Sequence, residues 1–365
     1  MSFHRFYVGD VLAVLKTMDS ESIHCVVTSP PYWGLRDYGV LGQMGMEPTP
    51  EDYVVRLVRA FREVRRVLRQ DGTLWLNMGD CYAWPGQGGS WDAQRRQKNT
   101  GRCLCTAQAN RGRYAGNKQK DLLGLPWRVA FALQDDGWYL RADVIWAKTN
   151  PMPESVIDRP TRSHEYIFLL AKSRRYWYDA LAISEPSAKV PIMRNKRSVW
   201  TIPTEPFPGA HFAVFPRALA ETCVLAGCPP LVCSVCGAPY VRETVRTGHV
   251  NRRTSAHAPG HCATKTSSTG WAPTTVPTDR FLPACECAAD AVPGTVLDPF
   301  GGSGTVTYVA MAHHRNSVYV DLNEIYADMA LDRCGFAQES PIDYHKYEIL
   351  RMDDLTASDA ELEVK

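Results

Sequence analysis

A short run near the start of the chain combines groups that can hydrogen-bond a flat polar ligand. Thr28-Ser29-Pro30-Pro31-Tyr32-Trp33 follows the apolar stretch 23–27, which is typical of a buried strand. The two prolines fix the backbone and remove two N–H donors, so the turn can present carbonyl acceptors, the Ser29 hydroxyl and an aromatic face together. These groups suit a ligand such as a nucleobase. Taken alone, the run fits a purely structural turn equally well.

A glycine-rich turn occurs far along the chain, at Asp298-Pro299-Phe300-Gly301-Gly302-Ser303-Gly304-Thr305, between a predicted strand and a predicted helix. Its glycines allow a ligand to approach the backbone, and a helix N-terminus favours electronegative groups. A dinucleotide fingerprint would need glycine at Thr307, and the Gly-Lys-Ser/Thr of a Walker loop is missing. A nucleoside-type cofactor remains, supported by Asp321, which is placed like an acid that binds ribose hydroxyls. A packing turn with a capping aspartate is the alternative.

Four cysteines have the spacing of a metal site. They are Cys233, Cys236, Cys285 and Cys287. Cys-x-x-Cys followed by glycine is half of a zinc knuckle, and the Cys-x-Cys pair completes four thiolates for a tetrahedral Zn²⁺. Such a closed site would be structural and would hold the surrounding segment together. His261 and Cys262 are competing ligands, and buried apolar cysteines are the alternative.

The elements that must position these residues alternate as in an α/β protein with a parallel sheet. Strands are expected at 23–27, 73–77, 138–148, 165–171, 294–297 and 317–320. Helices are expected at 51–68, 126–134, 216–225 and 306–312. Both chemical motifs follow predicted strands, where α/β sheets place their ligands.

The composition is that of an ordinary globular protein. The 365 residues include 41 basic and 39 acidic side chains, and 45% are hydrophobic, which excludes collagen-like, disordered and fibrous classes. No run approaches the roughly 18 apolar residues of a membrane span, and the start lacks a signal-peptide layout. We therefore expect a soluble, cytoplasmic protein without a membrane partner, whose cysteines stay reduced.

Together, the two motifs resemble those of the amino-group DNA methyltransferases, which use S-adenosylmethionine and carry S/D/N-P-P-Y/F/W and F-x-G-x-G. Ser29, Pro30, Pro31 and Tyr32 match the catalytic motif, and Phe300, Gly302 and Gly304 match the cofactor motif. The catalytic motif comes first, which resembles the circularly permuted β group of this family.

The resemblance implies a Rossmann-like class I methyltransferase sheet with permuted motif order and a zinc-knuckle insert. The expected catalytic domain is 1–228 with 294–340, the insert is 229–293, and 341–365 is a C-terminal tail. Three segments are candidates for reading DNA sequence. They are the basic loop 87–120, expected to be mobile, the proline-rich stretch 184–206, and the insert.

The resemblance also implies a set of cofactor-binding residues. They are Asp10, Asp298, Phe300, Gly302, Gly304, Thr305, Asp321 and Phe212. Asp10 resembles the family's acid near the cofactor adenine. Residues 211–216 fall where the family has its methionine-side segment, although the usual H-P-T-Q-K-P wording is missing.

The family chemistry is direct methyl transfer to an exocyclic amine. Hydrogen bonds from the amine to the Ser29 side chain and the Pro30 carbonyl would turn the nitrogen lone pair toward the sulfonium methyl. The base must be flipped out of the duplex, and Tyr32 could stack on it for about 1–3 kcal/mol. Trp33 and Trp146 are further candidate walls, with ordinary core packing as the alternative.

The expected partner is double-stranded DNA, with a cognate restriction endonuclease as a further possible partner. The segment 87–120 contains eight basic residues and one acid, and the insert contains six basic residues and four acids. The candidate DNA contacts are Arg95, Arg96, Arg111, Arg113 and Trp33. A solvated charged loop is the alternative for both segments.

Ser29 at the first motif position favours N4 of cytosine, because within the family S-P-P-Y is similar to N4-cytosine enzymes and D-P-P-Y to N6-adenine enzymes. The N6-adenine enzyme is the nearest alternative. A protein-glutamine methyltransferase would usually have Asn first and an upstream cofactor motif. A non-catalytic zinc DNA-binding module is the alternative from another class.

Overall fold

The computed structural model describes residues 2–35, 38–83, 118, 120–186, 193–205, 215–251, 271–336 and 345–352. The chain forms two units, Met1–Pro230 with Pro293–Lys365, and Leu231–Val292. The second unit lies within the expected insert 229–293. Within the described residues, no helix is long and apolar enough to cross a membrane.

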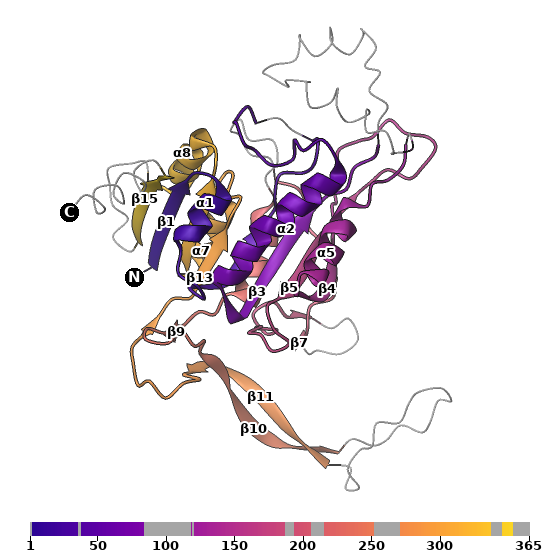
Figure 1. Ribbon diagram of the computed structural model, residues 1–365. Coiled ribbons are helices and arrows are strands. Elements are labelled where there is room, and N and C mark those ends of the chain that lie inside the picture. The colour runs from indigo at the N-terminus through magenta and orange to yellow at the C-terminus, as the bar shows by residue number, and fades with distance from the viewer. Residues whose placement is uncertain are drawn as a thin grey trace, which may run out of the picture. The chain divides into compact units, whose positions relative to one another are not determined.

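The first unit is built on a sheet of nine described strands in the order β15-β1-β14-β13-β2-β3-β5-β4-β8 (Figure 1). The strands are β1 Ser2–Val8, β2 Ile23–Thr28, β3 Leu68–Met78, β4 Tyr139–Ala147, β5 His164–Ala171, β8 Val199–Thr201, β13 Thr295–Asp298, β14 Asn316–Asp321 and β15 His345–Arg351. Only β5 runs against its neighbours in this sheet; the other described pairings are parallel. All six residues of β2 are buried, as expected for a central parallel strand covered on both faces.

Helices cover both faces of this sheet. They are α1 Val11–Thr17, α2 Pro50–Val67, α5 Leu125–Asp135, α6 Arg217–Gly227, α7 Thr305–Ala312 and α8 Glu324–Arg333. Val26 of β2 packs in one core cluster with buried residues of α1, α2 and α5, which lie together in Figure 1. Cys25 and Val27 point to the other face and pack with α6 and α7. The strand period of two therefore divides one apolar run between two cores.

Local sequence explains where α2 begins. The Thr49 hydroxyl accepts the Asp52 N–H, and Pro50 occupies the first turn, where no N–H partner is needed. Tyr53, Leu57 and Val64 then recur on the buried face. The helix ends one residue short of the expected 51–68, because β3 begins at Leu68 and not at the expected 73.

The strands β13 and β2 are neighbours although they come from opposite ends of the chain. Val296 pairs with Cys25, and Leu297 pairs with Val26. From this pair the connections diverge, since β2 leads through α2 to β3, and β13 leads through α7 to β14 on the other side. In open α/β sheets, the crevice at the carboxyl ends of such strands is the usual ligand site.

Two of the remaining segments contain strands that were not expected from the sequence. The stretch 341–365 was expected to be a tail, but His345–Arg351 forms β15, which pairs in parallel with β1 at the sheet edge. The stretch 184–206, a candidate for reading DNA sequence, contains β8, which joins the sheet beside β4, and Trp200 there is only 4% exposed. With three residues, β8 is too short for a clear period-2 pattern. A two-stranded ribbon, β6 Glu185–Pro186 with β7 Met193–Arg194, precedes β8.

The second unit consists of paired strands. β10 Val241–Asn251 and β11 Trp271–Leu282 form a long antiparallel ribbon, and β9 Val232–Cys233 pairs with β12 Ala291–Val292. An isolated two-stranded ribbon is marginally stable in water, so this unit needs a further stabilising element.

Candidate functional site

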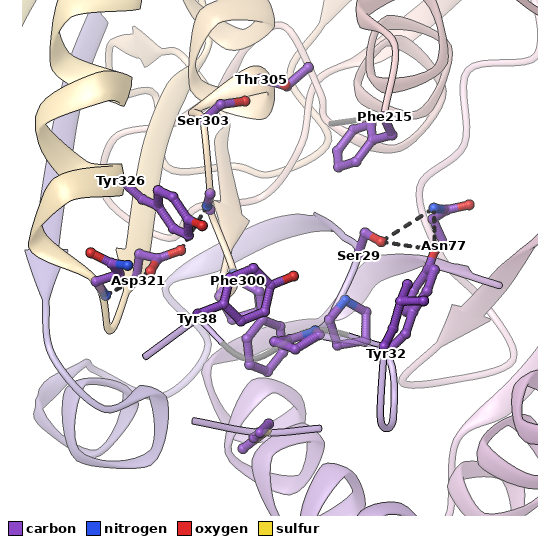
Figure 2. Close-up of a pocket in the computed structure, with 18 of the residues that line it drawn as sticks. Ser29, Tyr32, Tyr38, Asn77, Phe215, Phe300, Ser303, Thr305, Asp321 and Tyr326 are labelled. Carbon is purple, nitrogen blue, oxygen red and sulfur yellow. Dashed lines mark hydrogen bonds between the residues drawn. The ribbon is translucent and has the colours of Figure 1, made fainter. Parts of the chain in front are cut away.

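A cavity of about 750 Å³ opens at the carboxyl ends of β13 and β2. Figure 2 shows Ser29, Tyr32 and Asn77 at one end and Phe300, Asp321 and Tyr326 at the other. The two motifs expected to act together from their sequences thus line one cavity, brought there by the pairing of β13 with β2.

Glycine is required in the turn after β13 because neighbouring residues occupy the space of a side chain. A Cβ on Gly301 would lie 2.2 Å from the Tyr319 ring. Gly304 has φ +72, and a Cβ there would lie 2.6 Å from the Ala330 Cβ. The turn therefore presents backbone to the cavity, and α7 begins directly after it, at Thr305.

Two carboxylates hold this turn. Asp298 accepts the Thr28 hydroxyl at 2.7 Å and the Phe300 N–H at 3.2 Å, and burial raises its pKa to about 7. Asp321 accepts the Gly302 and Asn323 N–H groups, each at 2.8 Å, and burial raises its pKa to about 6. Asp321 lines the cavity, whereas Asp298 is 2% exposed and ties the turn to the end of β2.

Two further segments reach the cofactor-motif side of the cavity. Asp10, at the end of β1, lines the cavity while its carboxylate caps α1 by accepting the Leu12 and Ala13 N–H groups. Phe215 also lines the cavity. The expected contact Phe212 lies outside the described residues.

At the other end, the first motif joins a hydrogen-bond network. The Ser29 hydroxyl donates to Tyr32 Oη at 3.2 Å, and Tyr32 Oη–H donates to Glu165 Oε2 at 2.8 Å. The Asn77 amide nitrogen lies 3.0 Å from Tyr32 Oη, 3.0 Å from Glu165 Oε2 and 3.3 Å from Ser29 Oγ. Burial, followed by the charge of Glu165, raises the pKa of Tyr32 well above its ordinary value, so the phenol stays neutral.

The second oxygen of Glu165 is also bound. Lys148 Nζ donates to Glu165 Oε1 at 2.5 Å and lies 4.6 Å from the centre of the Trp146 ring. Gly79 packs beside Tyr32, because a Cβ there would lie 2.8 Å from the ring carbon Cε2. The first motif is therefore held by residues at or just beyond the ends of β3, β4 and β5.

Comparison with known proteins places the chain in a family. The DNA methylase profile, which covers N6 and N4 methyltransferases, matches residues 23–233. A Type II methyltransferase, M.SmaI of Serratia marcescens, is 44% identical over 330 residues, or 90% of both chains. The chain belongs to the N6/N4 DNA methylase family. The resemblance expected from the two motifs is thereby confirmed, and the protein is a DNA methyltransferase.

Other relatives of this methylase agree. M.XycI of Xanthomonas campestris pv. cyanopsidis, another Type II methyltransferase, is 42% identical over 90% of the methylase and 86% of M.XycI. Among solved structures, the cytosine-N4-specific PvuII DNA methyltransferase has a TM-score of 0.54 at 16% identity, covering 90% and 86% of the two chains. The Thermus thermophilus protein TTHA0409, complexed with S-adenosyl-L-methionine, has a TM-score of 0.51 at 22% identity, covering 95% and 98%. These two likenesses confirm the α/β methyltransferase fold.

Three polar residues of the methylase site were missed by the sequence reasoning, namely Asn77, Lys148 and Glu165. Each is a polar residue at or just beyond the end of a predicted apolar strand, which is the available signal. None of the three is next to a proline- or glycine-rich motif of the kind that marks Ser29 and Phe300.

Trp33 of the methylase, an expected DNA contact, is buried in the structure. Trp33 is 4% exposed, packs in the core beside α2, and donates its indole N–H to the Glu47 carbonyl at 2.9 Å. Trp146 is 3% exposed and bonded to the Ile202 carbonyl, but it does line the cavity. Arg95, Arg96, Arg111 and Arg113 lie outside the described residues, as does most of the expected loop 87–120.

The four cysteines of the methylase's second unit converge. The sulfur atoms of Cys233, Cys236, Cys285 and Cys287 all lie within 4.8 Å of one another. Tetrahedral Zn²⁺ with Zn–S bonds of about 2.3 Å requires sulfurs about 3.8 Å apart, so the cluster fits this ion with little adjustment. The N–H groups of Cys236 and Val235 donate to Cys233 and lower its pKa to about 6, which favours the thiolate. His261 and Cys262 lie outside the described residues.

Proposed function

We propose that the protein is a site-specific DNA (cytosine-N4)-methyltransferase that transfers a methyl group from S-adenosylmethionine to a flipped-out cytosine in double-stranded DNA. The observation that carries this proposal is the convergence of the Ser29–Tyr32 turn and the Phe300–Thr305 turn on one cavity. Ser29 at the first motif position favours cytosine over adenine, through resemblance to the N4-cytosine members of the family. The motif order supports the permuted group.

The glycine-rich end of the cavity fits the cofactor. Its backbone is open to a ligand because Gly301 and Gly302, which carry no side chains, line the cavity. The ionised Asp321 carboxylate would accept the ribose hydroxyls, while Phe300, Phe215 and Tyr326 supply apolar surface. When bound, S-adenosylmethionine supplies an activated methyl group on a sulfonium. Asp298 would act by holding the turn, because its hydrogen bonds go to Thr28 and Phe300 inside the fold.

The opposite end of the cavity supplies the acceptors that an exocyclic amine needs. Its nitrogen is a poor nucleophile because the lone pair is delocalised into the ring. Ser29 Oγ and the Pro30 carbonyl would accept the two amine hydrogens, which favours a tetrahedral nitrogen with its lone pair directed at the methyl group. Tyr32 would stack on the flipped base.

The cysteine cluster of the second unit is proposed to hold one structural Zn²⁺. Four thiolates leave no open coordination position, so the ion would stabilise the fold of Leu231–Val292 and take no part in methyl transfer. Three segments are proposed to contact DNA. They are 87–120 and the insert, through their basic residues, and 184–206. The Type II relatives are the reason to look for a partner restriction endonuclease.

The test is incubation of the full chain with unmethylated genomic DNA and labelled S-adenosylmethionine, then nucleoside mass spectrometry and single-molecule sequencing. N4-methylcytosine at one short sequence is the expected product. N6-methyladenine would overturn the cytosine assignment and keep the mechanism, whereas unlabelled DNA would contradict the proposed substrate. Ser29→Ala should abolish labelling while cofactor binding persists, because Ser29 lies outside the cofactor turn.

A further inference from the structure

The hydrogen bonds behind Ser29 form a chain with a defined direction. Ser29 Oγ–H donates to Tyr32 Oη, and Tyr32 Oη–H donates to Glu165 Oε2, over 3.2 and 2.8 Å. The chain runs from the turn after β2 to the first residues of β5. Its members are only partly exposed, and Glu165 itself has a side-chain exposure of 16%.

Glu165 determines this direction. An ionised carboxylate can only accept hydrogen bonds, so Tyr32 must turn its single proton toward it. The Tyr32 oxygen then offers lone pairs, and Ser29 turns its proton toward Tyr32. One Ser29 lone pair faces the Asn77 amide at 3.3 Å, and the other remains for a ligand in the cavity. A serine hydroxyl that is not held by Tyr32 and Glu165 could turn either its proton or a lone pair toward the ligand.

Both oxygens of Glu165 accept hydrogen bonds. Lys148 donates to one oxygen at 2.5 Å, and Tyr32 and Asn77 donate to the other at 2.8 and 3.0 Å. Lys148 and Glu165 form an ion pair, and charge-assisted bonds of this kind are short and strong. The phenol cannot replace it as the anion, because burial and Glu165 raise the pKa of Tyr32 well above its ordinary value.

We propose that Glu165 directs this chain, so that Ser29 accepts a hydrogen bond from the target amine and Glu165 receives, through Tyr32, the proton which that amine releases. This inference rests on the proposed function, since it needs an amine bound at Ser29. It makes Glu165 a positioning residue that acts through Tyr32 and Ser29. It also gives the Tyr32 hydroxyl a role separate from stacking by the ring.

The step balances as follows. The amine nitrogen forms a bond to the methyl carbon while the carbon–sulfur bond breaks, and its electron pair stays on sulfur. The nitrogen, now carrying two hydrogens, the methyl group and a positive charge, gives one proton to Ser29 Oγ. Ser29 passes its own proton to Tyr32 Oη, and Tyr32 passes its own to Glu165 Oε2. The neutral Glu165 returns this proton to water after the product leaves.

The test uses Glu165→Gln, Tyr32→Phe and the double variant in the full chain, with a duplex containing the methylated site found for the wild type. Single-turnover methylation is measured at saturating cofactor and DNA, beside the dissociation constants of both. We expect each single variant to be at least about 10-fold slower, with both dissociation constants within about 2-fold of wild type. Because both variants interrupt one chain, the double variant should be no slower than the slower single variant.

Two variants separate this role from a structural one. Glu165→Asp keeps an accept-only group and should recover part of the rate lost in Glu165→Gln. Glu21→Gln removes a Glu–Lys pair with Lys172, far from the cavity, and should methylate at the wild-type rate. A wild-type rate in Glu165→Gln or Tyr32→Phe, multiplicative losses in the double variant, or a loss confined to cofactor affinity would overturn the inference. A wild type that methylates no DNA would instead contradict the proposed function.

Discussion

Asp321 connects proton binding to cofactor binding at the scale of single residues. Its pKa is raised to about 6 by burial, and the ionised form is the one that accepts hydrogen bonds from ribose hydroxyls. The affinity for S-adenosylmethionine should therefore fall as the pH drops below about 6. Isothermal titration between pH 5.5 and 8 measures this, and Asp321→Asn should bind more weakly at pH 8 and show a flatter profile. A wild-type affinity that is constant over this range would contradict the ribose assignment.

Asp298 should affect stability instead. Its pKa is about 7 in the fold against 3.8 for the free group, so between these values the folded state binds more protons than the unfolded state. Its contribution is therefore fully present below about pH 4 and is lost as the pH rises through 7. Asp298→Asn keeps an acceptor for Thr28 and cannot ionise. The difference in melting temperature between Asp298→Asn and wild type should therefore increase from pH 5 to pH 8. A difference that stays constant over this range would refute this account.

These residues differ in how far sequence could predict them. Asp321 and Ser29 were found because each lies at the end of a predicted strand, and Ser29 also belongs to a recognisable motif. Glu165 was not, because its partners Tyr32 and Asn77 lie 133 and 88 residues away in the chain and meet it only through strand order. The burial of Trp33 could not be predicted, because an aromatic side chain next to a motif looks the same in sequence whether its ring faces solvent or core.

At the scale of the elements, the turn between β13 and α7 depends on Gly304. Alanine there would carry the strain of φ +72 and a Cβ 2.6 Å from the Ala330 Cβ. We expect Gly304→Ala to lower the free energy of unfolding by about 1–3 kcal/mol in urea titrations and to weaken cofactor binding. Gly124→Ala is a matched control, since Gly124 also precedes a helix, with φ +66, but a Cβ would meet nothing within 4 Å. Equal losses in the two variants would show that backbone strain alone matters.

Element prediction succeeded where the pattern was long or bounded by strong turn signals. Helix α2 and strand β2 were placed within one residue, because a cap, a proline or a full turn of apolar residues defines each end. β15 and β8 were missed because their positions at the sheet edges come from β1 and β4, which supply their partners. The order of the strands is likewise a tertiary property.

At the scale of the whole molecule, the two units should respond differently to metal removal. If Zn²⁺ binds the four thiolates, the purified protein should contain one zinc per chain, and Cys233→Ser should abolish it. Chelation should then make Leu231–Val292 sensitive to limited proteolysis, while the main melting transition, that of the sheet unit, persists. A zinc-free protein that resists proteolysis in this segment would show that the cysteines need no ion.

The pairing of β13 with β2 also has a consequence for how the enzyme is made. The acceptor turn after β2 is translated early, but its sheet neighbour is translated only after the whole second unit. Until then β2 lacks a partner on one side, and a ribosome-bound nascent chain holds the acceptor end of the site without the cofactor turn. Catalytic competence thus arrives late in synthesis. The same arrangement suits a split enzyme made of two fragments, with the chain divided between β10 and β11. Activity should return only when β13 of one fragment pairs with β2 of the other.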